Sequence, residues 1–438
     1  MNTNRIPAKT LFKTMLLFTL ASMLFASATF AAAQTERILY SFTGGTGDGS
    51  DPYAGVTADS SGALYGALSE AGEFGDGVIY KLTPPSGSSG RWTESVIYAF
   101  TGGTDGGGPT SDLAIDSSGN LYGITNGGGS GNCGTVFQLV PPSGGTTWTE
   151  NTLYNFLCGS AGLSEEPGDV ILDPSSGKLY GVAGYTGEFG GGYVYQLTPP
   201  ASGGSWTYTV LHSFNNNSGT AGYAKGCDPW SLTLGRDGAL YGTTIYCGAG
   251  GGVVYKLSPP SGGGTTWIEH VLYTFGAEGT SPNGYSPYGL VFGADGVLYG
   301  VTALGGASGN GTVYSLTPAP SGEPWTQAIL HNFGATADGN LPIAGVIFGP
   351  DGVLYGTTAG GGASETTCGF YQGCGTVFQL TPGSGGTYSE TILHEFAATG
   401  GDAINPDPGR LLFLGGTLYG TSYQGGHLGL GGVFAVRP

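Results

Sequence analysis

One short sequence motif recurs seven times along this chain, and it constrains the fold more than any other feature. Its Leu-Tyr-Gly core begins at Leu64, Leu121, Leu179, Leu240, Leu298, Leu354 and Leu418. The spacings are 57, 58, 61, 58, 56 and 64 residues. A period of this length is typical of repeat architectures rather than of one ordinary globular core.

Each repeat contains four strand-like runs, which we call a, b, c and d. In the second repeat they are residues 113–116, 120–125, 135–139 and 148–156. The chain has 89 Gly in 438 residues, a density that opposes long helices, and its short aromatic and β-branched runs are typical of strands. Asp-Gly turns such as Asp59 to Gly62 join a to b as a hairpin. We therefore expect an all-β protein built from four-stranded antiparallel units.

The phase of the repeat distinguishes an open solenoid from a closed ring. Strand d carries the motif Leu/Ile-Tyr/His-x-Phe, and its first copy, at residues 39–42, precedes any strand a, whereas the last unit ends after strand c. An N-terminal strand that completes the last unit closes a ring and hides two sheet edges. The sequence thus predicts a seven-bladed β-propeller. Its blades are expected at about 44–100, 101–156, 157–214, 215–275, 276–333, 334–396 and 397–438 plus 36–42.

Residues 1–33 have the pattern of a signal peptide. A basic start with Arg5, Lys9 and Lys13 is followed by an apolar run and by three alanines at 31–33. We expect export, cleavage before Gln34, a single propeller domain over 34–438 and no membrane span after cleavage. An uncleaved anchor is the alternative, although the apolar run is short for a span.

The repeat text resembles a known family. Gly352 to Gly361 reads Gly-Val-Leu-Tyr-Gly-Thr-Thr-Ala-Gly-Gly, and Gly375 to Leu380 reads Gly-Thr-Val-Phe-Gln-Leu. This pattern is similar to the GloVer tandem repeats of secreted bacterial proteins, which differ in how they are anchored. The resemblance covers essentially the whole chain after residue 33 and implies an extracytoplasmic repeat protein. It transfers no catalytic residue. The last residues, 432–438, show no hydrophobic tail or sorting domain, which favours release from the cell.

The six cysteines test the predicted blade register. Cys133 precedes strand c of the second blade and Cys158 follows its strand d, so both are expected at one rim. Cys227 and Cys247 flank strands a and b of the fourth blade in the same way, and Cys368 and Cys374 share one loop. Behind a signal peptide, this arrangement predicts the disulfides 133–158, 227–247 and 368–374. A thiolate metal site is the alternative, but the spacings do not favour it.

All three bridges fall on the face formed by the d-to-a and b-to-c loops, which we call the loop face. These loops are long and contain more than half of the 30 acidic residues. With a formal net charge of −18, the chain is expected to repel nucleic acid. The acids form either a solvated rim or, less simply, a calcium site, since carboxylates are calcium ligands. No cofactor is implied with certainty, and a monomer is expected.

A group of candidate ligand-binding residues is expected at the mouth of the central channel. Trp230 departs from the periodic tryptophans and stands at the start of an innermost strand a, where other blades have Tyr53 and Tyr288. Asp112, Asp169 and Arg410 fall near the same level. An aromatic platform beside hydrogen-bonding side chains suits a sugar ring, and packing around the channel is the alternative.

Two classes of function remain open. The chain lacks a Gly-x-Ser-x-Gly nucleophile motif, a histidine-rich metal motif and a phosphate-binding loop. We therefore favour a secreted binding module that recognises a glycan, peptide or cation on the loop face. The alternative is an extracellular polysaccharide hydrolase or lyase, or a calcium-dependent lactonase, acting at the channel mouth. An enzyme predicts polar residues that converge on the axis with a strongly perturbed carboxylate.

Overall fold

A computed structural model describes most of the chain after residue 35. The described residues are 36–87, 90–158, 166–184, 186–217, 223–262, 264–277, 279, 281–319, 324–334, 338–362, 367–368, 371–406 and 409–438. The predicted signal peptide, residues 1–33, lies outside them and stays a prediction. Within the described part, no helix is long and apolar enough to cross a membrane.

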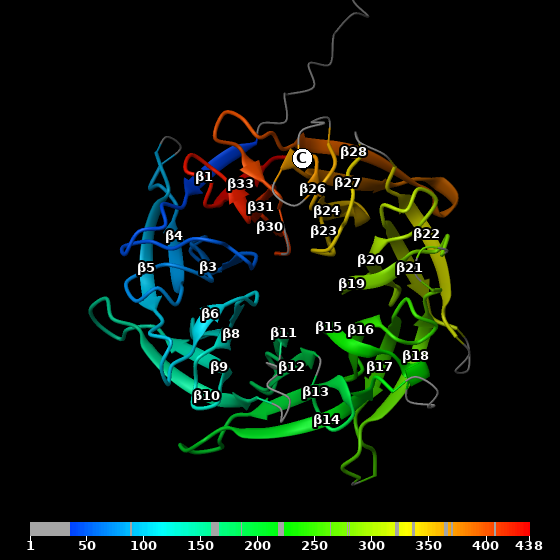
Figure 1. Cartoon of the computed structure of the whole chain (residues 1–438), viewed down its shortest axis with the longest axis horizontal. Coiled ribbons are helices and arrows are strands. Elements are labelled where there is room, and N and C mark those ends of the chain that lie inside the picture. The colour runs from blue at the N-terminus through cyan, green and yellow to red at the C-terminus, as the bar shows by residue number, and fades with distance from the viewer. Residues whose placement is uncertain are drawn as a thin grey trace, which may run out of the picture. The chain divides into compact units, whose positions relative to one another are not determined.

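The strands form seven four-stranded antiparallel blades arranged in a ring, a β-propeller, as predicted (Figure 1). Blade 1 contains β2 (Thr57–Ala58), β3 (Leu64–Leu68), β4 (Val78–Thr83) and β5 (Thr93–Ala99). Blade 2 contains a split inner strand, β6 (Gly107–Pro109) and β7 (Ala114–Ile115), followed by β8 (Leu121–Gly127), β9 (Asn132–Val140) and β10 (Thr149–Leu157). Blade 3 contains β11 (Glu166–Leu172), β12 (Leu179–Gly184), β13 (Gly190–Thr198) and β14 (Thr207–Asn215). Blades 4 and 5 contain β15 (Cys227–Leu234), β16 (Leu240–Tyr246), β17 (Val253–Ser258), β18 (Ile268–Thr274); and β19 (Tyr285–Phe292), β20 (Leu298–Leu304), β21 (Thr312–Thr317), β22 (Thr326–Asn332).

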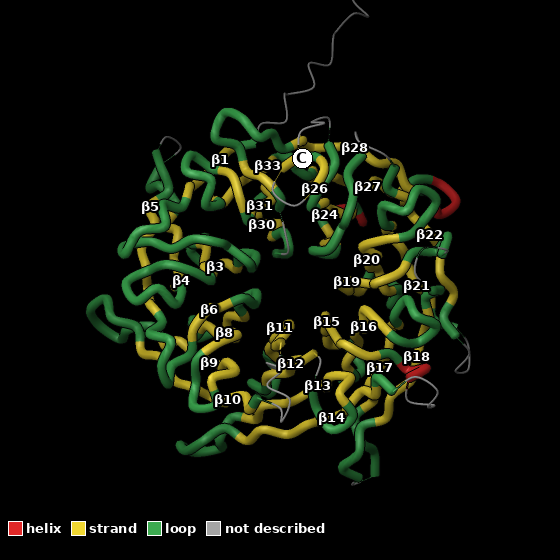
Figure 2. The backbone as a smooth tube through the Cα atoms, viewed as in Figure 1, coloured by secondary structure: helices red, strands yellow, loops and turns green. Residues whose placement is uncertain are grey.

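Blade 6 contains β23 (Val346–Phe348), β24 (Leu354–Thr358), β27 (Thr376–Pro382) and β28 (Tyr388–Glu395). Short ribbons decorate the loops of blades 6 and 7, namely β25 (Thr367–Cys368) with β26 (Tyr371–Gln372), and β29 (Ala403–Ile404) with β32 (Gln424–Gly425). Helix is limited to three-residue 3-10 turns at Tyr223–Lys225, Pro350–Gly352 and Ser384–Gly386 in the described residues (Figure 2).

The ring closes between the two ends of the described chain. Blade 7 consists of β30 (Leu412–Leu414), β31 (Thr417–Ser422), β33 (Gly432–Val436) and, as its outermost strand, β1 (Arg37–Ser41). β1 pairs antiparallel with β33, with Ile38 opposite Phe434 and Ser41 opposite Gly432 (Figure 1). The predicted closure by the N-terminal strand is therefore confirmed, and it leaves β33 with no free edge.

The repeated Leu-Tyr-Gly text is explained by close packing inside each blade. The glycine lies under the aromatic ring of the next strand, so that a Cβ on Gly66 would come within 2.3 Å of the Tyr80 hydroxyl oxygen. The tyrosine of the motif reaches the turn before it, and the Tyr65 hydroxyl donates to Asp59 at 2.9 Å. That turn contains Gly62 at φ +82°, which confirms the predicted hairpin.

The hydrophobic core is divided among the seven contacts between neighbouring blades, which we call seams. Each of the seven buried clusters combines residues of two adjacent blades. At the seam between blades 7 and 1, for example, Phe42 packs on Tyr80 with ring centroids 5.0 Å apart. A four-stranded sheet cannot bury both faces alone, so each blade depends on its neighbours.

The periodic tryptophans also lie at the seams. Each packs against the Leu-Tyr-Gly tyrosine of the preceding blade. The centroid distances are 6.0 to 6.3 Å for Trp92 with Tyr419, Trp148 with Tyr65, Trp206 with Tyr122, Trp267 with Tyr180 and Trp325 with Tyr241. The interpretation of these tryptophans as packing residues is therefore confirmed.

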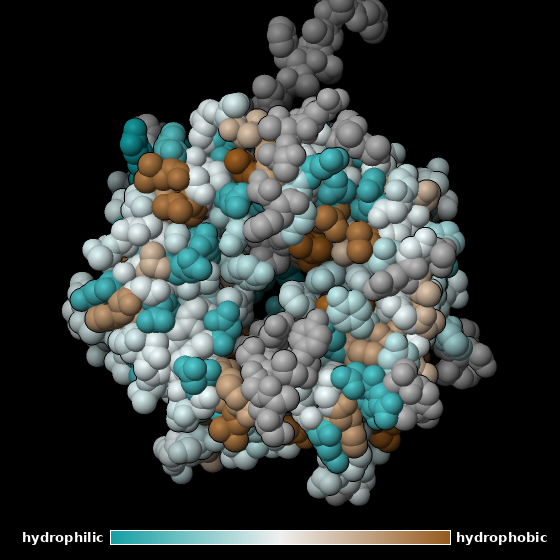
Figure 3. All heavy atoms as spheres, viewed as in Figure 1, coloured by the Kyte–Doolittle hydropathy of each residue, from teal (hydrophilic) through white to brown (hydrophobic). Residues whose placement is uncertain are grey.

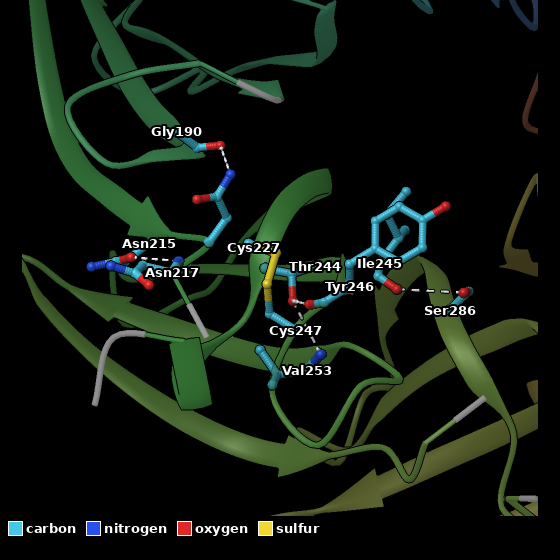
Figure 4. The surroundings of a disulfide bond; sticks show 11 residues. Gly190, Asn215, Asn217, Cys227, Thr244, Ile245, Tyr246, Cys247, Val253 and Ser286 are labelled. Atoms are coloured by element: carbon cyan, nitrogen blue, oxygen red, sulfur yellow. Dashed lines mark hydrogen bonds between the residues drawn. A yellow bond between two sulfur atoms is a disulfide. The ribbon is translucent and has the colours of Figure 1, made fainter. Parts of the chain in front are cut away.

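All three predicted disulfides are present. They join Cys133 to Cys158, Cys227 to Cys247 and Cys368 to Cys374, with Cα to Cα distances of 5.5, 5.3 and 5.0 Å. The second bridge ties the start of β15 to the turn after β16 (Figure 4). Disulfides persist in oxidising compartments, which agrees with an extracytoplasmic protein.

The acidic side chains of the loop face are not all exposed to solvent, in contrast to the expectation of a solvated rim. Asp48, Asp105 and Asp228 are buried. Asp48 accepts hydrogen bonds from the backbone N–H and the hydroxyl of Thr43 at 2.9 and 3.0 Å, and it therefore caps the turn that follows β1. Several of the loop acids are thus structural.

The ring closure leads to a stability prediction. Phe42→Ala should lower the free energy of unfolding by about 3–5 kcal/mol, because it removes a fully buried ring from the closing seam. Phe275→Ala, at the corresponding position of blade 4, should cost a similar amount, whereas the exposed Phe74→Ala should change it by less than about 0.5 kcal/mol. Denaturant titration followed by tyrosine and tryptophan fluorescence measures all three. If Phe42→Ala behaves like Phe74→Ala, the N-terminal strand does not close the ring.

Candidate ligand site at the ring axis

A small pocket lies on the axis of the ring, and every blade contributes to its wall. Its volume is about 90 Å³, and the space-filling view shows the ring hollowed at its centre (Figure 3). The lining residues are, from blade 1 to blade 7, Tyr53; Thr110, Ser111 and Asp112; Gly168 and Asp169; Trp230 and Ser231; Gly289; Ile343 and Ala344; and Arg410. Five of the six predicted ligand-binding residues are among them.

The three charged residues of the pocket occupy one structural position of the repeat. This position precedes the first buried hydrophobic residue of each innermost strand, and from blade 1 to blade 7 it holds Gly55, Asp112, Asp169, Ser231, Gly289, Gly345 and Arg410. Glycine allows neighbouring blades to approach closely, since a Cβ on Gly289 would lie 2.6 Å from the Cα of Gly345. The charged residues of blades 2, 3 and 7 therefore replace the glycine that close packing favours at this position in blades 1, 5 and 6.

Irregular pairing at the start of the innermost strands places these side chains. In β11 the register shifts between Pro167 and Val170, which leaves Gly168 and Asp169 opposite one residue of β12. β15 has a similar irregularity between Pro229 and Ser231, at Trp230. In blade 2 the inner strand is split into β6 and β7 around Asp112. Bulges of this kind re-aim side chains and are frequent beside functional sites.

An ion pair crosses the axis. The Arg410 guanidinium donates to Asp169 Oδ2 at 2.9 Å, and it thus joins blade 7 to blade 3. Asp169 also accepts the backbone N–H of Leu232 in blade 4. Asp112 accepts the backbone N–H of Gly55 at 2.6 Å and that of Arg410. The three side chains therefore connect blades 1, 2, 3, 4 and 7, which gives them a structural role whatever else they do.

The carboxyl groups of Asp112 and Asp169 share one countercharge, the Arg410 guanidinium, and both have a raised pKa. Burial and then the neighbouring Asp169 carboxylate raise the pKa of Asp112 to about 6, although Arg410 and the two backbone donors oppose the shift. Burial also raises the pKa of Asp169, against the opposing effect of Arg410. Asp112 is therefore a carboxyl group that can carry a proton under mildly acidic conditions.

Aromatic side chains border the charged group. Trp230 lines the pocket and packs edge-on against Tyr288, with ring centroids 5.4 Å apart. Tyr53 is 42% exposed and packs edge-on against Tyr423. Tyr288 is the one predicted site residue that does not line the pocket, and its role in the structure is to support Trp230.

The donor set of this pocket does not fit a calcium ion. Calcium takes six to eight oxygen ligands, whereas the described residues of the pocket wall include two carboxylates. Asp169 is already paired with the Arg410 guanidinium, a positive charge that would repel the ion. The sequence-based hypothesis of calcium at the channel mouth therefore gains no support from the residues that line it.

Sequence reasoning missed the serines of the pocket. Ser231 and Ser111 line the wall, and the Ser111 hydroxyl accepts the backbone N–H of Ile124 at 3.0 Å, while Ser231 lies 2.8 Å from the Thr243 hydroxyl. Aligning the seven copies at the residue before the first buried hydrophobic of strand a identifies Ser231. No signal identifies Ser111, because its position depends on the split inner strand of blade 2.

The fold and this pocket define a seven-bladed β-propeller with a polar axial site. The chain belongs to the Gloeobacter/Verrucomicrobia repeat family, whose profile matches residues 24–226 and 173–370. This confirms the family resemblance of the repeat text. A search of curated proteins found no match.

Several solved structures share the fold at low identity. An oligogalacturonate lyase of Vibrio parahaemolyticus has a TM-score of 0.52 and 10% identity, with 93% of this chain and 94% of that chain covered. A protein from Lactobacillus plantarum has a TM-score of 0.52 and 16% identity, with coverage of 82% and 88%. A periplasmic gluconolactonase of Pseudomonas aeruginosa has a TM-score of 0.48 and 14% identity, with coverage of 77% and 84%. The two structures with a TM-score of 0.52 support the propeller fold, and neither assigns an activity to this chain.

The raised pKa of Asp112 predicts a pH-dependent stability difference. The Asp112 carboxyl group binds its proton more tightly in the folded protein than in the unfolded chain. Its effect on the free energy of unfolding is therefore least unfavourable below pH 4, and it destabilises the fold as the pH rises to about 6 and above. Asp112→Asn should therefore gain roughly 1–3 kcal/mol relative to the wild type between pH 4 and pH 7. Denaturant titrations of both proteins at several pH values measure this. A difference that does not change with pH would contradict the assigned protonation.

Proposed function

We propose that this protein is a secreted binding β-propeller whose axial pocket recognises a carbohydrate. The observation that supports this most is the combination, in one pocket formed by all seven blades, of an aromatic platform with charged hydrogen-bonding groups. Carboxylates accept hydrogen bonds from sugar hydroxyls, a guanidinium donates them, and an indole face packs on the apolar side of a sugar ring. The predicted signal peptide and the three disulfides agree with secretion.

The size of the pocket defines what part of a carbohydrate enters it. About 90 Å³ corresponds to roughly three water molecules, which is room for one edge of a sugar ring rather than for a whole ring. The remainder of the ligand would lie over the surrounding loop face. Exposed aromatic residues stand near that face at Phe189, in the loop after β12, and at Tyr246, the last residue of β16, and they offer further platforms.

A glycan array with the purified chain tests the proposal. Among the glycans that bind, Trp230→Ala should weaken affinity at least about tenfold, because it removes the platform, and Asp169→Asn should weaken it by a similar factor. The control is Phe74→Ala, which removes an exposed aromatic residue outside the pocket and should leave the affinity for a monosaccharide unchanged. Absence of glycan binding, or binding that is insensitive to Trp230→Ala, would overturn the proposal. Binding of peptides or cations alone would have the same consequence.

One observation favours a second candidate, an extracellular polysaccharide hydrolase or lyase. Polar residues do converge on the axis, and Asp112 has the perturbed pKa that a catalytic acid needs. If the pocket is catalytic, product release from polysaccharides should fall as the pH rises through about 6, and Asp112→Asn should abolish it. Reducing-end and unsaturated-product assays across a polysaccharide panel measure this. Binding without turnover would leave the binding module as the function.

A further inference from the structure

The outer strands of neighbouring blades meet through a repeated polar contact that is separate from the axial pocket. At four of the described seams, the second residue of the Leu/Ile-Tyr/His-x-Phe motif faces an acid in the loop that follows it and a glutamate near the start of the next outer strand. At two of these seams the residue is tyrosine and donates to the acid, as Tyr40 does to Asp48 and Tyr98 does to Asp105, each at 3.1 Å. The glutamates of these two seams are Glu94 and Glu150. At the seam between blades 4 and 5, Tyr273 instead donates to Gln327 at 2.7 Å.

At the last two seams of the ring the tyrosine is replaced by histidine. Between blades 5 and 6, His331 Nε2 lies 3.2 Å from Asp338 Oδ1 and 3.5 Å from Glu390 Oε1. Between blades 6 and 7, His394 Nε2 lies 3.3 Å from Asp402 Oδ2, and Glu36 completes the group. In each group one atom from each side chain lies within 4.8 Å of the other two, and in the described part of the chain these are the two groups of three such side chains.

The geometry leaves more oxygen atoms than the imidazole can satisfy. A ring nitrogen carries at most one hydrogen, yet His331 Nε2 faces two carboxyl oxygens. Among the described residues, Glu390 Oε1 and Glu36 Oε1 are buried and accept no hydrogen bond. Glu94 Oε1 at a tyrosine seam and both carboxyl oxygens of Glu269 beside His212 are also buried without one. What distinguishes the seams of His331 and His394 is therefore the combination of an imidazole nitrogen with two carboxyl groups.

The distances suit a tetrahedral metal ion. Zinc bonds to nitrogen and oxygen of roughly 2.0–2.2 Å place neighbouring tetrahedral ligands roughly 3.3–3.5 Å apart. The separations of 3.2 and 3.5 Å at His331 are close to these values. The three side chains at the seam between blades 5 and 6 are 16% to 22% exposed, which allows water to reach a fourth position.

A third seam with a histidine contains a lysine beside its glutamate, and it can be compared with the seams of His331 and His394. Between blades 3 and 4, His212 Nε2 lies 3.2 Å from Glu269 Oε2, and Lys225 Nζ lies at the same distance from that oxygen. Lys225 stands in the loop that supplies the aspartate in the other histidine seams. A lysine ammonium group therefore contacts this glutamate, whereas among the described residues no lysine or arginine is paired with Glu390 or Glu36.

We propose that His331, Asp338 and Glu390, and likewise His394, Asp402 and Glu36, each bind one divalent transition-metal ion of the zinc type at the outer seams that flank blade 6. Each ion takes one imidazole nitrogen and two carboxylate oxygens, with water completing the shell. The supporting contacts are in place, since the Asp402 carboxylate is held by the backbone N–H groups of Ala397 and Ala403 at 3.0 and 2.8 Å. Because Glu36 immediately precedes β1, the second ion fastens the strand that closes the ring.

Zinc chloride alone is the probe for the test. After chelator treatment, the full chain should bind two zinc ions in equilibrium dialysis with metal analysis. His331→Tyr and His394→Tyr should each bind one, and the double variant none. Tyrosine occupies this position in other blades, so the variants are expected to fold, and circular dichroism checks that they do. Zinc should raise the Tm of the wild type but not that of the double variant.

The matched control is His212→Tyr, which alters the histidine at the lysine seam and should leave two zinc ions bound. The proposal would be overturned if the wild-type chain bound less than one zinc ion, or if a folded double variant bound as much zinc as the wild type. Either result would identify the two groups as hydrogen-bonded contacts like those of the tyrosine seams. Cobalt absorption spectroscopy on the wild type needs no variant. Visible bands of four-coordinate cobalt are expected, and a spectrum of hexa-aqua cobalt alone would count against the sites.

Discussion

Contact between neighbouring blades is the constraint on which this structure depends. A single meander has two faces to bury and no core of its own, so stability arises at the seams. The residues that define the repeat are seam residues. Tryptophan packs on the tyrosine of the preceding blade, phenylalanine packs on the aromatic residue of the following one, and the motif glycine makes room beneath that ring. A blade without a partner would expose all of these groups, and this explains why the N-terminal strand returns to complete blade 7.

The axial position of the repeat differs between blades. Three blades have glycine at this position because their inner strands approach closely, whereas Asp112, Asp169 and Arg410 introduce charge there. Arg410 pairs with Asp169 across the ring, and burial together with the Asp169 carboxylate raises the pKa of Asp112. Binding and structural bracing are compatible in this arrangement, since a rigid scaffold holds polar groups in place for a ligand.

The outer rim varies in a different way. The polar contact at a seam is made by tyrosine with aspartate, by histidine and lysine with one glutamate, or by histidine with two acids, while the surrounding strands stay unchanged. A repeat protein can alter the chemistry of one seam without disturbing the others, because each blade contacts only its neighbours. The axial pocket and the outer seams are therefore separate places where function can be added to the same frame.

Periodicity alone determined the number of blades, the four strands of each, the ring closure and all three disulfides. This was possible because strand direction fixes the rim at which each residue lies, as for Cys227 and Cys247. The level of Asp112, Asp169 and Arg410 on the axis was also predictable from their positions before strand a. The ion pair between Asp169 and Arg410, 241 residues apart, and the meeting of His394 with Glu36 were decided by the tertiary structure alone. Such contacts depend on bulges, side-chain directions and the register between blades, which a sequence period does not specify.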